Sequence, residues 1–217
     1  MVAIRALLTS IVWVLLGLTA LLLLASIAVR LVRRFYQFPI PAFIVPYIDN
    51  PFRRRIQPPE KIVEWMDVRQ GMSLLEVGPG PGTFTFAAAR GVGDTGCIYV
   101  IDIQETVVTS LCAKIEQQGF RNISAEQASA YDLPYPDHHF DRVYMVTVLG
   151  EIPDKQRALV EFKRVLKDDG YLAVGDIILV PDYPMKGSVT ALCREAVFDL
   201  AETYGIILHY LLLFSKA

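Results

Sequence analysis

Hydrophobic positions along this chain change their spacing several times, and each spacing predicts a kind of element. Short apolar runs alternate with longer stretches in which apolar residues recur every three or four positions. The short runs predict buried strands, and the longer stretches predict amphipathic helices. Strands that alternate with helices favour a parallel sheet covered on both faces. The predicted strands are 73–77, 97–101, 123–127, 140–146, 171–178, 198–204 and 209–214, and the predicted helices are 59–68, 83–90, 106–118, 155–166 and 190–196.

The last two predicted strands differ from the others because only a short turn containing Gly205 separates them. Such a short connection favours an antiparallel hairpin at the end of the sheet. We therefore predict an α/β fold with a doubly wound, mostly parallel, seven-stranded sheet and a C-terminal antiparallel hairpin. Residues 59–217 are enough for one domain with its own core.

The N-terminal part of the chain carries a longer hydrophobic pattern. Residues 6–29 are 24 residues without a charged side chain. A helix of that length rises about 36 Å, more than the roughly 30 Å hydrocarbon core of a bilayer. We predict a transmembrane anchor over 1–34, with a cleaved signal peptide or a buried core helix as alternatives. Because more arginines follow this run than precede it, we expect a single-pass membrane protein whose domain faces the cytoplasm.

Residues 35–58, between the predicted anchor and the predicted domain, are rich in proline and aromatic residues. Proline removes backbone donors and disfavours the helical conformation of its predecessor, so one continuous helix is not expected. The segment is too apolar for a solvated linker, and we predict an interfacial collar on the membrane. The basic run Arg53–Arg55 either binds anionic lipid headgroups, or is a solvated charge run, or pairs with carboxylates of the domain. The aromatic residues of the predicted collar are Phe35, Tyr36, Phe38, Phe43 and Tyr47.

Charge and cysteine content narrow the class of protein. The formal net charge of −2 gives no general attraction to nucleic acid, so no nucleic-acid partner is predicted. The three cysteines, at positions 97, 112 and 193, lack the paired spacing of a metal or redox motif, so no metal site is predicted. The sequence leaves the oligomeric state open.

A glycine-rich turn follows the first predicted strand of the domain. Residues 74–82 read Leu-Leu-Glu-Val-Gly-Pro-Gly-Pro-Gly, and Asp102 follows the next predicted strand. Such a turn brings backbone amides close to a ligand, and a carboxylate at the tip of the next strand suits two ribose hydroxyls. The pattern predicts a nucleoside-containing cofactor. Because the dinucleotide fingerprint needs its third glycine where this chain has Thr83, a cofactor without a pyrophosphate is favoured.

The glycine-rich turn resembles motif I of the class I methyltransferases that use S-adenosylmethionine, with Glu76 as the acid of that motif. The resemblance continues along the domain. Residues 129–137 are similar to the loop that holds the adenine, although that family commonly has aspartate where this chain has Ser129, and residues 140–147 are similar to motif II. The resemblance implies S-adenosylmethionine as the cofactor, with its ribose on Asp102 and its adenine on Ile103. The cofactor-binding residues that it implies are Glu76, Gly78, Gly80, Gly82, Asp102, Ile103, Ser129, Ala130 and Thr147.

The reaction that this resemblance implies limits the catalytic groups that are needed. A methyl group on a sulfonium is already activated, so alignment and exclusion of water supply much of the rate. A base is needed only for an acceptor that is protonated at neutral pH. The candidate catalytic residues are Glu151 and Asp176, which follow or end the fourth and fifth predicted strands, on the side where such sheets bind ligands. A helix cap at Glu151 and a loop hydrogen bond at Asp176 are the alternatives.

The sequence therefore predicts a membrane-anchored, S-adenosylmethionine-dependent methyltransferase that acts on a lipophilic small molecule or a lipid. Lipid amines, quinone-like phenols and apolar thiols all fit this prediction. One alternative is a non-catalytic, membrane-tethered subunit of the same fold that binds the cofactor or acts as a scaffold. A second alternative is a nicotinamide-dependent oxidoreductase, which Thr83 disfavours.

Overall fold

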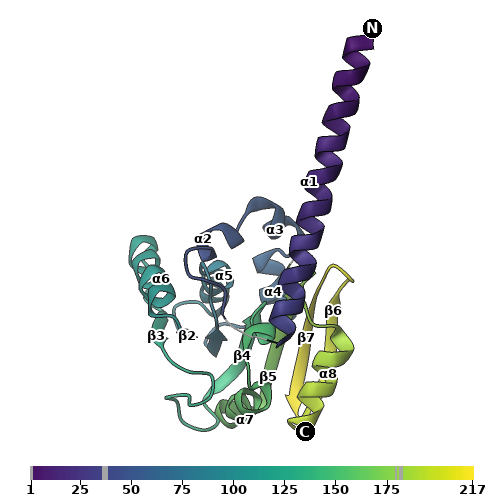
Figure 1. The fold of residues 1–217 in the computed structure, drawn as a ribbon. Helices are drawn as coiled ribbons and strands as arrows, with labels where there is room; N and C mark the ends of the chain where they lie inside the picture. The colour runs from purple at the N-terminus through teal and green to yellow at the C-terminus, as the bar shows by residue number, and fades with distance from the viewer. Residues whose placement is uncertain (1, 36–38, 179, 181–182) are drawn as a thin grey trace. The chain divides into compact units, whose positions relative to one another are not determined.

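The computed structural model describes residues 2–35, 39–178, 180 and 183–217. The chain divides into two compact units, residues 1–37 and residues 38–217. Helix α1 (Val2–Phe35) makes up the first unit, and the other described elements belong to the second (Figure 1).

The second unit is built around a sheet whose strands, within the described residues, have the order β3-β2-β1-β4-β5-β7-β6. Neighbours from β3 to β5 pair in parallel, whereas β7 pairs antiparallel with both β5 and β6. The predicted seven-stranded, mostly parallel sheet with a C-terminal antiparallel hairpin is therefore confirmed. The strands are β1 (Ser73–Val77), β2 (Cys97–Asp102), β3 (Ile123–Gln127), β4 (Phe140–Val146), β5 (Leu166–Ile177), β6 (Phe198–Gly205) and β7 (His209–Lys216).

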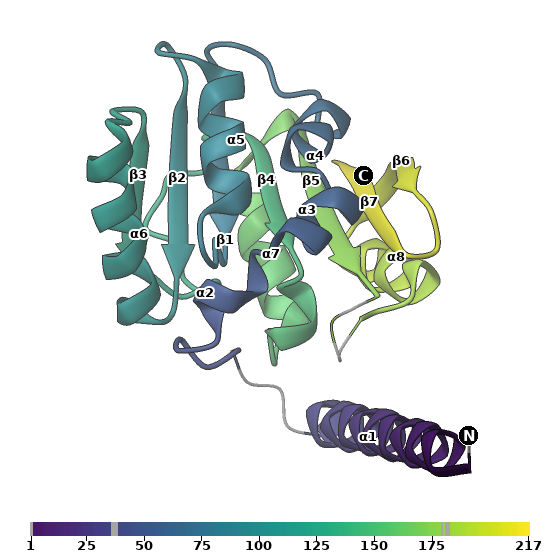
Figure 2. The same cartoon turned by 90° about the horizontal axis from the view of Figure 1, so that it is seen from above.

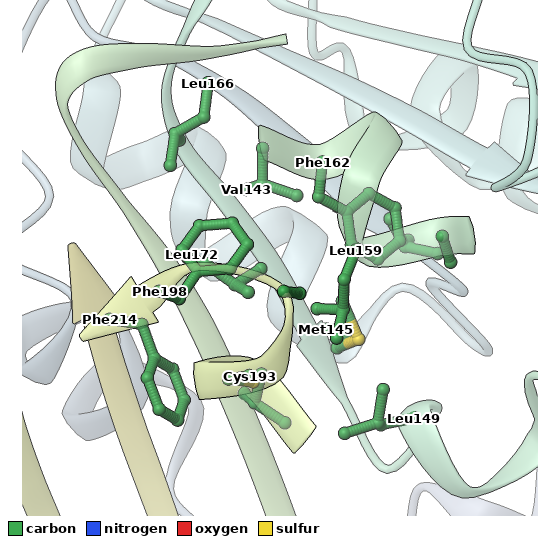
Figure 3. Packing of buried hydrophobic residues seen from close by; sticks show 14 of the residues in the cluster. Val143, Met145, Leu149, Leu159, Phe162, Leu166, Leu172, Cys193, Phe198 and Phe214 are labelled. Carbon is green, nitrogen blue, oxygen red and sulfur yellow. The ribbon is translucent and has the colours of Figure 1, made fainter. Parts of the chain in front are cut away.

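Helices cover both faces of this sheet, and each face has its own hydrophobic core. Buried residues of α4 (Pro59–Trp65), α5 (Thr83–Val92) and α6 (Glu105–Gln118) pack on one face. Buried residues of α7 (Lys155–Val165) and α8 (Lys186–Glu195) pack on the other. Figure 3 shows this second core, in which the side chains of β4 and β5 meet those of α7. The labelled residues there are Val143, Met145, Leu149, Leu159, Phe162, Leu166, Leu172, Cys193, Phe198 and Phe214.

Two boundaries differ from the prediction by four residues or more. β5 begins at Leu166 rather than at 171, because Leu166 pairs with Phe140 before an irregularity in the register. Helix α8 begins at Lys186 rather than at 190. In both places polar residues precede the apolar run, so hydrophobic spacing underestimates the length of the element.

Helix α1 is a single helix of 34 residues. Crossing a membrane takes about 20 consecutive apolar residues. Among the residues that the structure describes, no helix is both long and apolar enough to do so. The prediction of a single-pass membrane protein whose domain faces the cytoplasm is therefore wrong, and the span predicted within residues 1–34 is not found.

Residues 39–57 belong to the second unit, which thus begins before residue 59, where the sequence placed the start of the domain. They form the short helices α2 (Val45–Ile48) and α3 (Pro51–Ile56). The Asn50 side chain caps α3 by accepting a hydrogen bond from the backbone N–H of Arg53. In Figure 2, α2 lies at the end of the parallel strands to which their arrowheads point. Of the five aromatic residues of the predicted collar, Phe43 and Tyr47 are exposed, and Tyr36 and Phe38 lie outside the described residues.

Candidate functional site

The carboxyl edge of the parallel strands holds a cavity of about 240 Å³ with a mostly apolar wall. In the sheet, β1 lies between β2 and β4, so the chain builds strands first on one side of β1 and then on the other. Open α/β sheets bind ligands at such a switch point. The wall takes residues from the loops that follow β1, β2, β3 and β4, and from the segment 39–57.

The loop after β1 contributes backbone rather than side chains. Gly78, Gly80 and Gly82 have φ values of +69°, +54° and +89°, in a region that strains residues with a Cβ atom. A Cβ on Gly80 would meet no protein atom within 4 Å, and Gly80 lines the cavity. A Cβ on Gly78 would lie 2.6 Å from Val148 Cγ2, and one on Gly82 would lie 2.7 Å from Phe86 Cε2. Gly80 therefore keeps space open for a ligand, whereas the other two glycines allow protein atoms to pack closely.

Asp102 ends β2 at the cavity wall. Its Oδ1 accepts a hydrogen bond from the backbone N–H of Gln104 at 2.8 Å. Burial raises the pKa of Asp102, and hydrogen bonds from the backbone of Gln104 and Ile103 oppose that rise. Ile103 lines the same cavity beside it. The strand tip thus offers an oriented carboxylate next to an apolar side chain, which suits a ribose and its base.

The loop after β3 brings Ser129 and Ala130 to the same cavity. Ser129 Oγ accepts a hydrogen bond from the backbone N–H of Tyr131 at 3.2 Å, and Ser129 O accepts one from the N–H of Asp132 at 3.2 Å. Both bonds stabilise the turn. The Ser129 side chain therefore shapes this loop, in a position where the resemblance leads one to expect an aspartate.

Thr147 follows β4 and completes the carboxyl edge. Its φ of +63° is uncommon for a residue with a branched side chain. Its Oγ1 donates a hydrogen bond to Val146 O at 2.6 Å and accepts one from Arg53 Nη2 at 3.0 Å. Such strained backbone is typical of functional sites, where the surrounding contacts hold it in place.

Glu76 and Gly82 are the predicted cofactor residues that do not line the cavity. Glu76 is 2% exposed and lies opposite Tyr144 in the register of β1 and β4. Burial raises the pKa of Glu76 to about 7, and the nearby hydroxyls of Thr85 and Tyr144 oppose that rise. Glu76 is therefore a buried polar group behind the glycine-rich loop, on the face of the sheet covered by α5.

The segment 39–57 forms a wall of the cavity that the sequence analysis did not predict. The backbone N–H of Ile40 donates to Glu151 Oε2 at 2.9 Å, and Gln104 Nε2 donates to Ile40 O at 3.0 Å. These hydrogen bonds fasten the segment to the loops after β4 and β2. Val45 and Ile48 add apolar surface to the same wall. The interleaved apolar residues of the segment are the sequence signal of this wall, because they need an apolar surface to cover.

Arg53 reaches the cavity from α3. Besides its hydrogen bond to Thr147, its guanidinium lies over the ring of Phe84, 5.9 Å from the ring centre. Burial lowers the pKa of Arg53, and the charges of Asp49 and Asp176 oppose that change. Within the basic run at 53–55, Arg54 pairs with the carboxylate of Asp49, as one of the predicted alternatives has it, whereas Arg53 lines the cavity.

The two candidate catalytic carboxylates lie in different places. Glu151 ends the 3₁₀ turn η1 (Leu149–Glu151) and lines the cavity. Asp176, in β5, is 1% exposed and is not part of the wall. Its Oδ1 accepts a hydrogen bond from the backbone N–H of Ile177 at 2.8 Å. The site therefore presents Glu151 to a ligand and holds Asp176 behind the wall.

Known protein families and structures that resemble this chain identify its family and its fold. The methyltransferase domain family matches residues 69–209. The chain belongs to this family. The ubiquinone/menaquinone biosynthesis C-methyltransferase of Psychromonas ingrahamii is 35% identical over 113 residues, which are 52% of this chain and 45% of that protein. The demethylmenaquinone methyltransferase of Geobacillus stearothermophilus is 32% identical over 119 residues, which are 55% of this chain and 51% of that protein. The chain thus spans about half the length of these relatives.

The fold also occurs in a solved structure, a SAM dependent methyltransferase from Aquifex aeolicus. The TM-score is 0.78 at 23% sequence identity, over 82% of this chain and 100% of that one. The predicted class of enzyme, an S-adenosylmethionine-dependent methyltransferase, and the predicted cofactor are confirmed. The segment 39–57 lies before the residues that the family matches.

Proposed function

We propose that this methyltransferase transfers the methyl group of S-adenosylmethionine to the ring of a lipophilic demethylquinol, the reduced form of a demethylquinone. One observation carries the proposal: a single, mostly apolar cavity contains most of the predicted cofactor-binding residues together with Glu151. Two relatives support the choice of acceptor, since their names refer to ubiquinone and menaquinone biosynthesis and to demethylmenaquinone.

The residues of the cavity fit a cofactor that has a nucleoside but no pyrophosphate. Asp102 and Ile103 provide a carboxylate and an apolar surface side by side at the tip of β2. Beside them, the position of a Cβ on Gly80 is empty of protein atoms within 4 Å. We propose that the ribose binds Asp102, that the adenine packs on Ile103 near Ala130, and that the rest of the cofactor passes over Gly80 toward Thr147.

When bound, S-adenosylmethionine supplies a methyl group activated by its sulfonium. The chain then has to align the acceptor with that group and keep water out. The segment 39–57 serves both purposes in this proposal. Ile40 is fastened to Glu151 on one side and to Gln104 on the other, so its apolar neighbours are held over the cavity. Burying an apolar ring against such a wall costs little free energy, whereas a charged acceptor would lose its hydration.

Glu151 is the proposed catalytic residue. A hydroxyl on an aromatic ring has a pKa near 10, so it is protonated at neutral pH and its ring carbon is a better nucleophile once the proton is removed. Glu151 Oε2 accepts the Ile40 N–H, which orients the carboxylate at the wall. We propose that this carboxylate accepts a hydrogen bond from the ring hydroxyl and takes its proton as the ring carbon bonds the methyl group and S-adenosylhomocysteine leaves. The hydrogen on that ring carbon is then released to solvent as a proton, which restores the aromatic ring. Asp176 has no direct part in this mechanism.

The test is methyl transfer by the full chain in detergent micelles. The purified protein is incubated with isotope-labelled S-adenosylmethionine and, in separate reactions, a short-chain demethylmenaquinol, a long-chain amine or a long-chain thiol. Mass spectrometry of the products should show a labelled methyl group on the ring of the quinol. Labelling of the amine or the thiol alone would contradict the acceptor class. Cofactor binding without transfer to any acceptor would instead favour a non-catalytic cofactor-binding protein.

Glu151→Gln provides the matched variant. It keeps a side-chain oxygen that can accept the Ile40 N–H, but it cannot take a proton. Turnover should fall about 100-fold or more, the usual scale for loss of a general base, while the affinity for S-adenosylhomocysteine stays the same. Unchanged turnover would remove Glu151 from the mechanism.

A further inference from the structure

Arg53 and Asp102 both line the cavity. Asp102 ends β2, whereas Arg53 donates its hydrogen bond to Thr147, directly after β4. β1 lies between these two strands. Since neighbouring strands are about 4.8 Å apart, the ends of β2 and β4 are separated by roughly 10 Å. An extended ligand held by Asp102 at one end therefore reaches toward Arg53 with its other end.

The guanidinium of Arg53 is held in position before any ligand arrives. Thr147 Oγ1 accepts the N–H of Nη2, and the ring of Phe84 lies under the guanidinium plane within the range of a cation–π contact. Arg53 Nε, in contrast, is buried and has no hydrogen-bond partner among the residues that the structure describes. A buried donor of a charged group costs free energy unless it is paired, so this geometry favours an anion in the cavity.

We propose that Arg53 binds the carboxylate of the amino-acid part of S-adenosylmethionine. This inference rests on the proposed cofactor position, because that position directs the amino-acid part toward Thr147. A guanidinium matches a carboxylate through two parallel N–H donors, and such charge-assisted bonds are strong where water is excluded.

The proposed acceptor does not supply the anion. A demethylquinol ring is neutral while its hydroxyl is protonated, and that hydroxyl is assigned to Glu151 in the proposed mechanism. The cofactor, in contrast, always carries a carboxylate at neutral pH. A cofactor carboxylate on Arg53 would also tie α3, and with it the segment 39–57, to the bound ligand. Binding of the cofactor would thus fasten the wall under which the acceptor is held.

The experiment compares two ligands by calorimetry on the full chain. S-adenosylhomocysteine has the adenosine, the thioether and the amino acid, whereas 5′-methylthioadenosine has the adenosine and the thioether alone. The variant is Arg53→Gln, and Arg53→Lys keeps the charge without the paired donors. Arg55→Gln is the matched control, because Arg55 belongs to the same helix and is exposed. Thermal unfolding of each variant checks that the fold is kept.

Arg53→Gln should weaken binding of S-adenosylhomocysteine about 10- to 100-fold and leave binding of 5′-methylthioadenosine unchanged within about twofold. Arg53→Lys should give an intermediate loss, and Arg55→Gln none. An equal loss for both ligands would show that Arg53 only supports the fold of the cavity and would overturn the proposal while leaving the cofactor site in place. Unchanged affinity for both ligands, with a higher KM for the acceptor, would assign Arg53 to the acceptor instead. If the unaltered protein binds neither ligand, the proposed cofactor position itself is wrong.

Discussion

Replacing Gly80 with alanine should weaken cofactor binding while the domain stays folded, whereas replacing Gly82 should chiefly destabilise the domain. Both glycines have positive φ, and an alanine there costs about 1–2 kcal/mol. A Cβ on Gly82 would also lie 2.7 Å from Phe86 Cε2 and 2.8 Å from Leu111 Cδ1, two buried side chains. Overpacking of this kind costs about 1–3 kcal/mol more. The free energy of unfolding should therefore fall by about 1–2 kcal/mol for Gly80→Ala and by about 2–5 kcal/mol for Gly82→Ala.

The affinity for a ligand should fall more for Gly80→Ala than for Gly82→Ala. The methyl group of Gly80→Ala meets no protein atom and occupies space in the cavity, so it should weaken binding of S-adenosylhomocysteine about 10-fold or more. Urea unfolding followed by circular dichroism gives the stabilities, and calorimetry gives the affinities. Gly187→Ala is the control, because it lies in α8 with open space around its Cβ and should leave both quantities nearly unchanged. Normal binding by Gly80→Ala, or a larger loss of stability for it than for Gly82→Ala, would refute the reasoning.

Two further predictions concern carboxyl groups. Asp102→Asn keeps an oxygen for the Gln104 N–H but loses the charge, so S-adenosylhomocysteine should bind about 1.5–3 kcal/mol more weakly; an unchanged dissociation constant in calorimetry would exclude the ribose contact. Glu76 should make stability depend on pH, because burial raises the pKa of its folded state to about 7 from 4.5. The folded state then holds the proton more tightly than the unfolded state, so the contribution of Glu76 to the free energy of unfolding should be largest below pH 4.5 and fall by up to about 3 kcal/mol as the pH rises to 7. Urea unfolding at pH 5 and pH 8 should show this loss in the unaltered protein and not in Glu76→Gln; equal losses in both would mean that another group is responsible.

Most of the sheet could be predicted because its strands are continuous apolar runs and its turns contain glycine. Local spacing also placed Asp102 correctly, since a residue directly after a strand lies at the edge of the sheet. The start of β5 was missed because the polar residues 167–169 interrupt its apolar pattern, although Leu166 already pairs with Phe140. The pairing with a neighbouring strand, rather than the hydrophobicity of its own residues, defines that end of the element.

The candidate site could be predicted less completely, for two physical reasons. Side chains alternate along a strand, so Glu76 and Leu74 belong to one face, covered by α5, while Leu75 and Val77 belong to the other. The position of Glu76 in a motif therefore did not imply contact with the cavity. The wall at 39–57 was missed because its contacts are distant along the chain; Ile40 and Glu151, for example, are 111 positions apart. Its apolar residues were assigned to a membrane instead of to the domain.

The position of the segment 39–57 in the chain has a consequence for how this site can change. The segment lies before residues 69–209, which the family matches, and it contributes one wall of the cavity. Mutations in a few codons of this stretch reshape one wall of the cavity without altering the loops at Gly80 and Asp102. Val45 and Ile48 line that wall, so a change in their size changes the shape of the cavity, whereas Arg53 is held by its contacts with Thr147 and Phe84. A few substitutions in the segment 39–57 can therefore reshape the cavity while the loops that carry Gly80 and Asp102 keep their sequence.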